Sequence, residues 1–229
     1  MTRMLASVAT LDEARIAAGC GVDIIDLKNP QEGALGALSA DTVATIVRDL
    51  KGAAPISATI GDLPMQPERI RAAVEAMAAT GVDYVKLGCF PGGDWPGVFA
   101  VLKPLTARGV RLVAVLFADH PIDLSWLPVL ARSGFAGAML DTADKQAGAL
   151  TTIRNSQFLR DFVDAAHRLG LLCGLAGSLR ISDIAPLRLL GPDYLGFRGA
   201  LCGGLRTDKL DPAAVSSVLA HIRNALSAA

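Results

Sequence analysis

Strand-like and helix-like hydrophobic patterns alternate along the whole chain. Short apolar runs that suit buried strands cover residues 4–10, 22–28, 55–61, 82–88, 111–118, 135–141, 171–177 and 194–200. Near-continuous apolar runs are typical of parallel strands that helices cover on both faces. The pattern therefore predicts an α/β protein built on a parallel sheet.

Amphipathic segments lie between most of these runs. They predict helices over residues 11–21, 67–81, 155–170, 182–191 and 211–226. Pro67 and Pro212 suit the first turn of their helices, and Ser182 is the expected N-cap of the helix that follows it. Gly-Val-Asp turns at 21–23 and 81–83 mark the return from a helix to the next strand.

About eight β/α units fit this alternation, which is the number in a closed parallel barrel. Single barrels of this kind commonly reach the present length of 229 residues. An open, doubly wound sheet would alternate in the same way, but no G-x-G-x-x-G motif follows the first strand. No Pro- or Ser-rich linker divides the chain. We therefore predict a single (β/α)8 TIM-barrel domain over residues 1–229, with an open sheet as the second interpretation.

Charged residues stand where three of the predicted strands end. Lys28 and Lys86 each end an apolar run, and Asp141 ends another, four residues before Lys145. A charge in such a run is costly unless it is paired or lies at the open end of the strand. Active sites of TIM barrels lie at the C-terminal ends of the strands. Because side chains alternate along a strand, Asp26 shares a face with Lys28, so we expect lysines and carboxylates to meet at the barrel mouth.

Such a cluster suits carbonyl chemistry. A partly desolvated lysine loses its proton more easily and attacks a carbonyl to form a Schiff base. Repulsion between ammonium groups lowers the pKa of at least one lysine, and a second lysine or a carboxylate can then transfer protons. Either strand-end lysine alone is equally compatible with a solvated loop charge. The prediction of a catalytic site therefore depends on the cluster.

Two glycine-bearing turns follow the last two predicted strands. They place Gly177 and Ser178 after the seventh strand and Arg198 and Gly199 after the eighth. Loops at these positions of TIM barrels often bind phosphate through backbone N–H groups, and a guanidinium adds a fork of donors. Ordinary turn glycines would give the same spacing. We predict a phosphate between these two turns, bound mostly by backbone N–H groups. Arg198 either adds its guanidinium to this site or points outward and pairs with a helix carboxylate, in which case the loop binds through its backbone alone.

The composition excludes some classes of binding partner. The formal net charge is zero, which argues against nucleic acid or an anionic membrane as a partner. No apolar stretch suits a membrane span, and the N-terminal residues lack the basic, apolar and small-residue order of a signal peptide, so we expect a cytoplasmic protein. His120 follows Asp119 at a strand end and is the histidine we expect nearest a site. The cysteines have neither metal-ligand nor disulfide spacing, so we interpret them as small buried residues and predict no metal: Cys20, Cys89, Cys173 and Cys202.

The chain resembles the (5-formylfuran-3-yl)methyl phosphate synthase family, also called 4-(hydroxymethyl)-2-furancarboxaldehyde-phosphate synthases, of methanofuran biosynthesis. The resemblance runs along essentially the whole chain. The strings DIIDLKNP and MLDTADK are specific to it, whereas other barrel aldolases have turns like GLAGS. The strings that carry the resemblance are DIIDLKNPQEGALGA, YVKLGCF, MLDTADK, GLAGSL and GFRGALC.

The resemblance implies a class I aldolase-like lyase that needs neither a redox cofactor nor a metal. It joins two molecules of glyceraldehyde 3-phosphate and releases one phosphate and water as the furan forms. By resemblance, Lys28 is the Schiff-base lysine and Lys86 the proton acceptor, while Asp141 and Lys145 belong to the site. Because the reaction takes two phosphorylated trioses, we expect a second anion nearer Lys145.

Two other functions fit the same residues. The first is a phosphotriose or phosphosugar isomerase or epimerase, which would share the phosphate loops but need no imine. The second is a barrel that binds a phosphorylated metabolite without catalysis. The Gly-bearing segment 29–37 either covers the site or only turns the chain. We expect a homo-oligomer, whose size the sequence does not fix.

Overall fold

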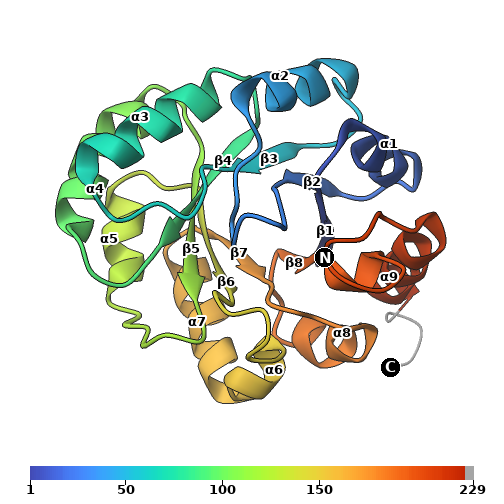
Figure 1. Cartoon of the computed structure of the whole chain (residues 1–229). Helices are drawn as coiled ribbons and strands as arrows, with labels where there is room; N and C mark the ends of the chain where they lie inside the picture. The colour runs from blue at the N-terminus through green and yellow to red at the C-terminus, as the bar shows by residue number, and fades with distance from the viewer. Residues whose placement is uncertain (225–229) are drawn as a thin grey trace.

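The strands form a closed barrel around which the helices are arranged (Figure 1). The computed structural model describes residues 1–224. Each strand pairs in parallel with the next strand in the chain, and β8 closes the barrel by pairing with β1. The strands are β1 (Arg3–Val8), β2 (Ile24–Leu27), β3 (Ile56–Thr59), β4 (Tyr84–Cys89), β5 (Leu112–Phe117), β6 (Gly137–Asp141), β7 (Leu172–Leu175) and β8 (Tyr194–Phe197).

The helices cover the outside of the barrel, as the alternating pattern predicted (Figure 1). Their inner faces and the outer faces of the strands share one buried apolar cluster. The described helices are α1 (Leu11–Gly19), α2 (Ala40–Asp49), α3 (Pro67–Ala78), α4 (Trp95–Ala107), α5 (Trp126–Arg132), α6 (Leu150–Ile153), α7 (Ser156–Arg168), α8 (Ile181–Arg188) and α9 (Pro212–Asn224), with the 3-10 helix η1 (Gly199–Leu201).

The (β/α)8 TIM barrel is confirmed, and the open-sheet interpretation is wrong because the sheet closes through β1 and β8. One predicted helix start is also wrong. Ser182 is not the N-cap of α8, because the helix already begins at Ile181. The Asp183 carboxylate accepts the backbone N–H of Arg180 at 2.8 Å, which starts the helix two residues earlier than expected. The predicted helix 211–226 is α9, and its residues 225 and 226 lie outside the described residues.

The inside of the barrel changes from apolar to polar along several strands. Leu5, Ile24, Tyr84 and Met139 belong to the apolar cluster inside the barrel. Side chains that face the same way recur every second residue, so the next inward position on each strand lies closer to the C-terminal end. These next positions are Ser7, Asp26, Lys86 and Asp141, all of them buried. The strands thus carry a buried polar layer above an apolar one.

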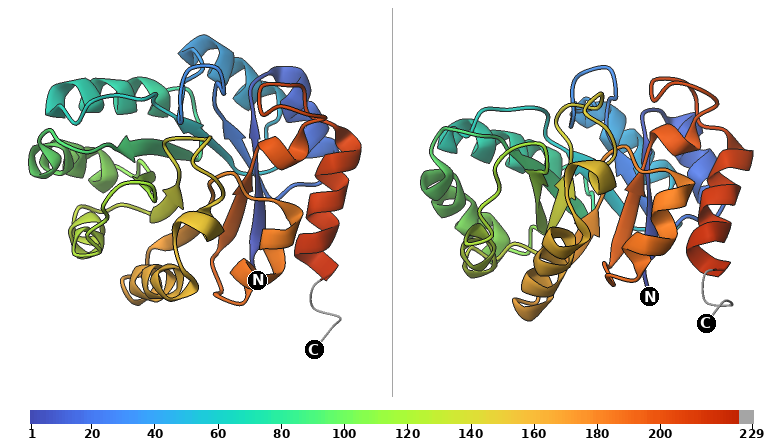
Figure 2. Two further views of the ribbon diagram at one scale, coloured as in Figure 1. Left: turned by 60° about the horizontal axis from the view of Figure 1, so that its bottom comes forward. Right: turned by 90° about the horizontal axis from the view of Figure 1, so that it is seen from below.

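The polar layer lies toward the loops that follow the strands. The loops after β2, β6 and β8 rise on the side away from the N-terminus, as the right-hand view of Figure 2 shows. In a parallel barrel this is the C-terminal face, where the loops are free to form a site while the helices hold the strands. None of the helices described for residues 1–224 is long and apolar enough to cross a membrane.

Candidate active site

Asp26 is the buried centre of the polar layer. The pairing register sets Ser7 of β1 and Ser57 of β3 on either side of it. Both hydroxyls donate to its carboxylate, at 3.0 Å from Ser7 Oγ and 2.6 Å from Ser57 Oγ. Lys86 Nζ of β4 donates to the same carboxylate at 3.0 Å. Burial alone would raise the pKa of Asp26, but the charges of Lys86 and Lys28 and these hydrogen bonds outweigh burial and lower it.

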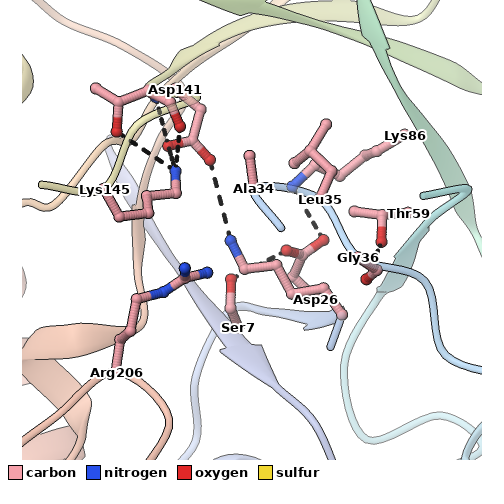
Figure 3. Close-up of polar contacts among 12 residues, drawn as sticks. Ser7, Asp26, Ala34, Leu35, Gly36, Thr59, Lys86, Asp141, Lys145 and Arg206 are labelled. Atoms are coloured by element: carbon pink, nitrogen blue, oxygen red, sulfur yellow. Dashed lines mark hydrogen bonds and ion pairs between the residues drawn. The ribbon is translucent and has the colours of Figure 1, made fainter. Parts of the chain in front are cut away.

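The loop after β2 covers the strand that carries Lys86. Asp62 accepts the backbone N–H groups of Ala34 and Leu35, each at 2.8 Å. Thr59 Oγ1 donates to the carbonyl of Gly36 at 3.0 Å, which ties the loop to β3 (Figure 3). Leu35 is fully buried in the apolar cluster inside the barrel. The segment 29–37 therefore covers part of the mouth, and Lys86 is only 2% exposed.

Asp141, at the end of β6, is the centre of a second cluster. Its Oδ1 lies 2.6 Å from Lys145 Nζ, and its Oδ2 lies 4.0 Å from Lys28 Nζ. Lys145 also donates to the carbonyl of Thr142, so that lysine is held on both sides (Figure 3). Burial would raise the pKa of Asp141, but Lys145 and Lys28 outweigh burial and lower it to about 2. Asp141 is therefore ionised at neutral pH.

Lys28 lies between the two carboxylates without a close hydrogen bond to either. Its side chain is 7% exposed, and its nearest acidic partner is Asp141 at 4.0 Å. Burial, which disfavours the charged amine, lowers the pKa of Lys28 from 10.5 to about 8. Asp141 and Asp26 oppose this shift, whereas Lys145 and Lys86 add to it. At pH 7 roughly a tenth of such an amine is unprotonated, against less than about 0.1% of an ordinary lysine.

The clusters open into a cavity of about 860 Å³ at the C-terminal face. This volume suits small metabolites, since ligand sites commonly span roughly 300–1,000 Å³. Asp141 is the one carboxylate among the described residues that line it. The basic residues of the lining are Lys28, Lys86, Lys145, Arg180, Arg198 and Arg206. Asp26 and Glu13 lie outside this lining and pair with Lys86 and Arg198, but the remaining cationic groups still favour an anionic ligand.

The turn after β7 also lines the cavity. Gly177 and Ser178 both have left-handed backbone conformations, with φ of 114° and 47°. Left-handed backbone is unusual for a residue with a side chain, such as Ser178, and residues held in this conformation cluster at active sites and ligand-binding segments. Among the described residues, the backbone N–H groups of Gly177, Ser178 and Leu179 have no backbone or side-chain acceptor. The turn therefore offers free donors to an anion, next to the first turn of α8.

The structure pairs Arg198 with a helix carboxylate, which is the second of the two expected arrangements, but the side chain is buried and does not point outward. Its guanidinium is 6% exposed and donates to the Glu13 carboxylate of α1 at 2.6 and 3.1 Å. Its Nε donates to the carbonyl of Arg206 at 2.8 Å. The other two donors reach the carbonyls of Ser7 at 3.2 Å and Asp208 at 2.8 Å. All five N–H donors are engaged by the protein, so Arg198 holds the loop after β8 and has no fork left for a phosphate.

The structure brings the predicted lysines and aspartates together and adds residues that the sequence reasoning missed. Ser7 and Ser57 have no distinctive motif, and only the strand register reveals them. Arg206 lies in a loop without a hydrophobic pattern, yet it lines the cavity. His120 lies away from this cavity, in a smaller one of about 240 Å³ beside Trp95 and Trp126.

The cysteines were expected to be buried and to bind no metal. Cys89 and Cys173 are buried as expected, whereas Cys20 and Cys202 are partly exposed. The thiols are free. Within residues 1–224, histidine, cysteine and acidic side chains form no group of three or more that could hold a metal ion.

Comparison with known families gives a match along most of the chain. The family model described as 4-HFC-P synthase matches residues 4–219. A relative from Methylorubrum extorquens, named provisionally as (5-formylfuran-3-yl)methyl phosphate synthase, is 41% identical over 96% of this chain and 92% of its own length. The (5-formylfuran-3-yl)methyl phosphate synthase of Methanosarcina barkeri is 33% identical over 96% of this chain and 98% of its own length. That of Methanocaldococcus jannaschii is 35% identical over 88% and 90%.

Solved structures with the same fold are much more distant in sequence. Phosphoribosyl anthranilate isomerase from Thermus thermophilus superposes with a TM-score of 0.69 at 15% identity and covers 97% of this chain and 99% of its own. A 3-hexulose-6-phosphate synthase gives a TM-score of 0.66 at 14% identity and covers 98% and 99%. At such identities the likeness concerns the barrel fold alone.

Proposed function

The chain belongs to the 4-HFC-P synthase family, and from this premise we propose that it forms (5-formylfuran-3-yl)methyl phosphate from two molecules of glyceraldehyde 3-phosphate. The reaction runs through a Schiff base and releases one phosphate and water. It serves the synthesis of a methanofuran-type cofactor. The whole chain acts as one catalytic domain.

Lys28 is the main support for this proposal, because its pKa is lowered and its side chain lines the cavity. Its neutral amine attacks the carbonyl carbon of a triose phosphate, and loss of water from the adduct gives an iminium. The ionised Asp141 carboxylate, 4.0 Å from Lys28 Nζ, lies where it stabilises that positive charge. Lys145 holds Asp141 from the other side at 2.6 Å and keeps it ionised.

Lys86 and Asp26 are assigned to proton transfer during enolisation and carbon–carbon bond formation. The two form one hydrogen-bonded unit at 3.0 Å, and Lys86 also lines the cavity. Ser7 and Ser57 fix the Asp26 carboxylate, so the ammonium of Lys86 has a defined position. A positioned acid–base group is what the enamine and aldol steps need.

The phosphate groups are assigned to the rim of the cavity. The free N–H groups of the turn Gly177–Leu179 bind one phosphate, and Lys145 lies near the second. Gly199 lines the same cavity from the β8 side. Ser178→Asp places a negative charge at the first site, so it should raise the KM for glyceraldehyde 3-phosphate steeply. Circular dichroism checks that the fold is intact, and an unchanged KM would place the phosphate elsewhere in the barrel.

Borohydride trapping tests the proposed reaction. The protein is incubated with glyceraldehyde 3-phosphate, reduced, and digested, and mass spectrometry locates the modified residue. We expect a stable triose adduct on Lys28. An isomerase or epimerase would turn over the triose phosphate without an adduct, and a non-catalytic barrel would bind it without turnover. An adduct on Lys86 instead would exchange the roles of the two lysines.

A further inference from the structure

We propose that Arg206 is the side chain that recognises a substrate phosphate, the role that the sequence suggested for Arg198. This inference rests on the proposed function and adds a specificity-determining residue to it. Arg206 lies in the loop after β8, outside every string that carries the family resemblance. Its burial, its anchored backbone and its free donors support this role.

Burial separates Arg206 from the rest of its loop. Residues 203–205 and 207–209 on both sides of it are exposed, whereas Arg206 is half-buried. An arginine in a surface loop normally extends its head group into water. Here the side chain lines the cavity instead, and Figure 3 shows its guanidinium directed toward Ser7 and Asp141.

The backbone of the loop is fixed around Arg206. Arg198 Nε donates to the carbonyl of Arg206 at 2.8 Å, and Arg198 Nη2 donates to the carbonyl of Asp208 at 2.8 Å. The Asp208 carboxylate accepts the N–H of Leu205 at 2.7 Å. Arg198 is in turn held by Glu13 at 2.6 Å. The buried ion pair thus positions the backbone from which Arg206 reaches into the cavity.

The guanidinium of Arg206 is nearly unused by the protein. Within residues 1–224 it forms no ion pair, and its one side-chain hydrogen bond is a long contact of 3.4 Å from Nη2 to the carbonyl of Gly33. A planar cation with spare donors in a concave site suits the oxygens of a phosphate monoester. The turn Gly177–Leu179, with its free N–H groups, lines the same cavity. In the proposed site, the Arg206 side chain and these backbone donors bind one phosphate from two sides of the cavity.

The first test measures phosphate binding directly. Isothermal titration calorimetry with inorganic phosphate compares the wild type with Arg206→Met, Arg206→Lys and Arg160→Met. Arg160 is an exposed arginine of α7 and serves as the matched control. We expect Arg206→Met to weaken phosphate binding roughly ten- to hundredfold, the usual range for losing a charge-assisted contact. Arg206→Lys should retain part of the affinity, and Arg160→Met all of it.

The second test asks whether Arg206 reads the phosphate of the substrate. Borohydride trapping is titrated with glyceraldehyde 3-phosphate and with unphosphorylated glyceraldehyde. Arg206→Met should raise the half-saturating concentration of the phosphorylated triose and leave that of glyceraldehyde unchanged. An equal change for both aldehydes would overturn the proposal, as would phosphate binding equal to that of the wild type. If the wild type forms no adduct at all, the proposed reaction fails, while the calorimetric titration still decides the role of Arg206.

Discussion

Two lysine–aspartate pairs line the same barrel mouth, and they are built in opposite ways. Lys86 Nζ and the Asp26 carboxylate lie 3.0 Å apart, and their side chains are 3% and 0% exposed. Two serine hydroxyls also donate hydrogen bonds to this carboxylate. Lys28 and Asp141 are also buried, but they lie 4.0 Å apart, and Lys145 takes the closer position on Asp141. In the first pair the Asp26 carboxylate is held by several hydrogen bonds, while in the second the Lys28 amine has no close partner.

The difference shows how one polar layer supports two kinds of lysine. In a buried ion pair such as Lys86 and Asp26, removing either partner leaves the charge of the other uncompensated. Burial, which disfavours the charged amine, lowers the pKa of Lys28 to about 8, and the charge of Lys145, which takes the closer position on Asp141, adds to this shift. Lys28 and Lys86 therefore differ in what surrounds the amine, since the residue types are the same.

The most damaging change should be removal of the Lys28 amine. Lys28→Arg keeps the positive charge but replaces the amine with a guanidinium, which is not a usable nucleophile at neutral pH. We expect no borohydride adduct and a loss of turnover of at least roughly 10⁴-fold. Intact-protein mass spectrometry after reduction makes the measurement. A variant that still forms the adduct would remove Lys28 from the nucleophilic role.

Lys86→Met should be the next largest change, and it affects both activity and stability. Turnover should fall by roughly two to four orders of magnitude, the usual span for an acid–base group, while an adduct still forms at Lys28. Breaking the buried pair should also cost roughly 3–5 kcal/mol of unfolding free energy, because Asp26 stays buried without its cation. Steady-state kinetics and urea denaturation measure the two effects.

The double variant Lys86→Met/Asp26→Asn separates these two effects. Neutralising both partners should return most of the lost stability, since no unpaired charge remains. Turnover should stay low, because the proton-transferring amine is still absent. Recovery of turnover together with stability would mean that Lys86 serves only to hold the fold.

A smaller effect should appear in the pH dependence of adduct formation. With the pKa of Lys28 at about 8, the trapping rate should rise about tenfold per pH unit below that value and level off above it. Lys145 is a cation that lowers the pKa of Lys28, so Lys145→Met should move the midpoint to higher pH. Asp141 raises it, so Asp141→Asn should move the midpoint to lower pH. Lys103→Met, on the exposed side of α4, is the control and should leave the midpoint unchanged.

The sequence predicted one part of this arrangement well. Alternation along a strand predicted that Asp26 and Lys28 share a face, and both are buried with each charge acting on the other, while the β/α repeat put the strand ends together in a closed barrel. These features depend on local periodicity, which a single sequence contains. The eight strands were found for the same reason, although some ends shifted by one to three residues.

The partners of these residues could not be predicted in the same way. That Lys86 pairs with Asp26 depends on the register between β2, β3 and β4, which no local pattern fixes. The choice between a phosphate and a helix carboxylate as the partner of Arg198 stayed open, because its partner Glu13 lies far away in the chain, on α1. Arg206 was missed since its loop has no periodic pattern, and only the anchored backbone makes its position meaningful.

The smallest expected effect is a change in the free energy of unfolding on Lys28→Met, and it tests the contrast between the two pairs most directly. The pKa of Lys28 is about 8 in the folded protein and near 10.5 when unfolded, so the unfolded chain binds more protons between these values. Protonated Lys28 therefore costs stability fully below about pH 8, and this cost disappears as the pH rises toward 10.5. Lys28→Met removes the cost, while Lys145 still holds Asp141 at 2.6 Å. We expect the free energy of unfolding to rise by about 1–3 kcal/mol at pH 7 and the gain to shrink strongly at pH 10. Urea denaturation of the wild type and of Lys28→Met at both pH values measures it.

The same substitution at Lys86 should destabilise the fold, so the two pairs should respond with opposite signs. A loss of stability in Lys28→Met at pH 7 would show that Lys28 and Asp141 form a structural ion pair like Lys86 and Asp26, and the contrast between the two lysines would not hold.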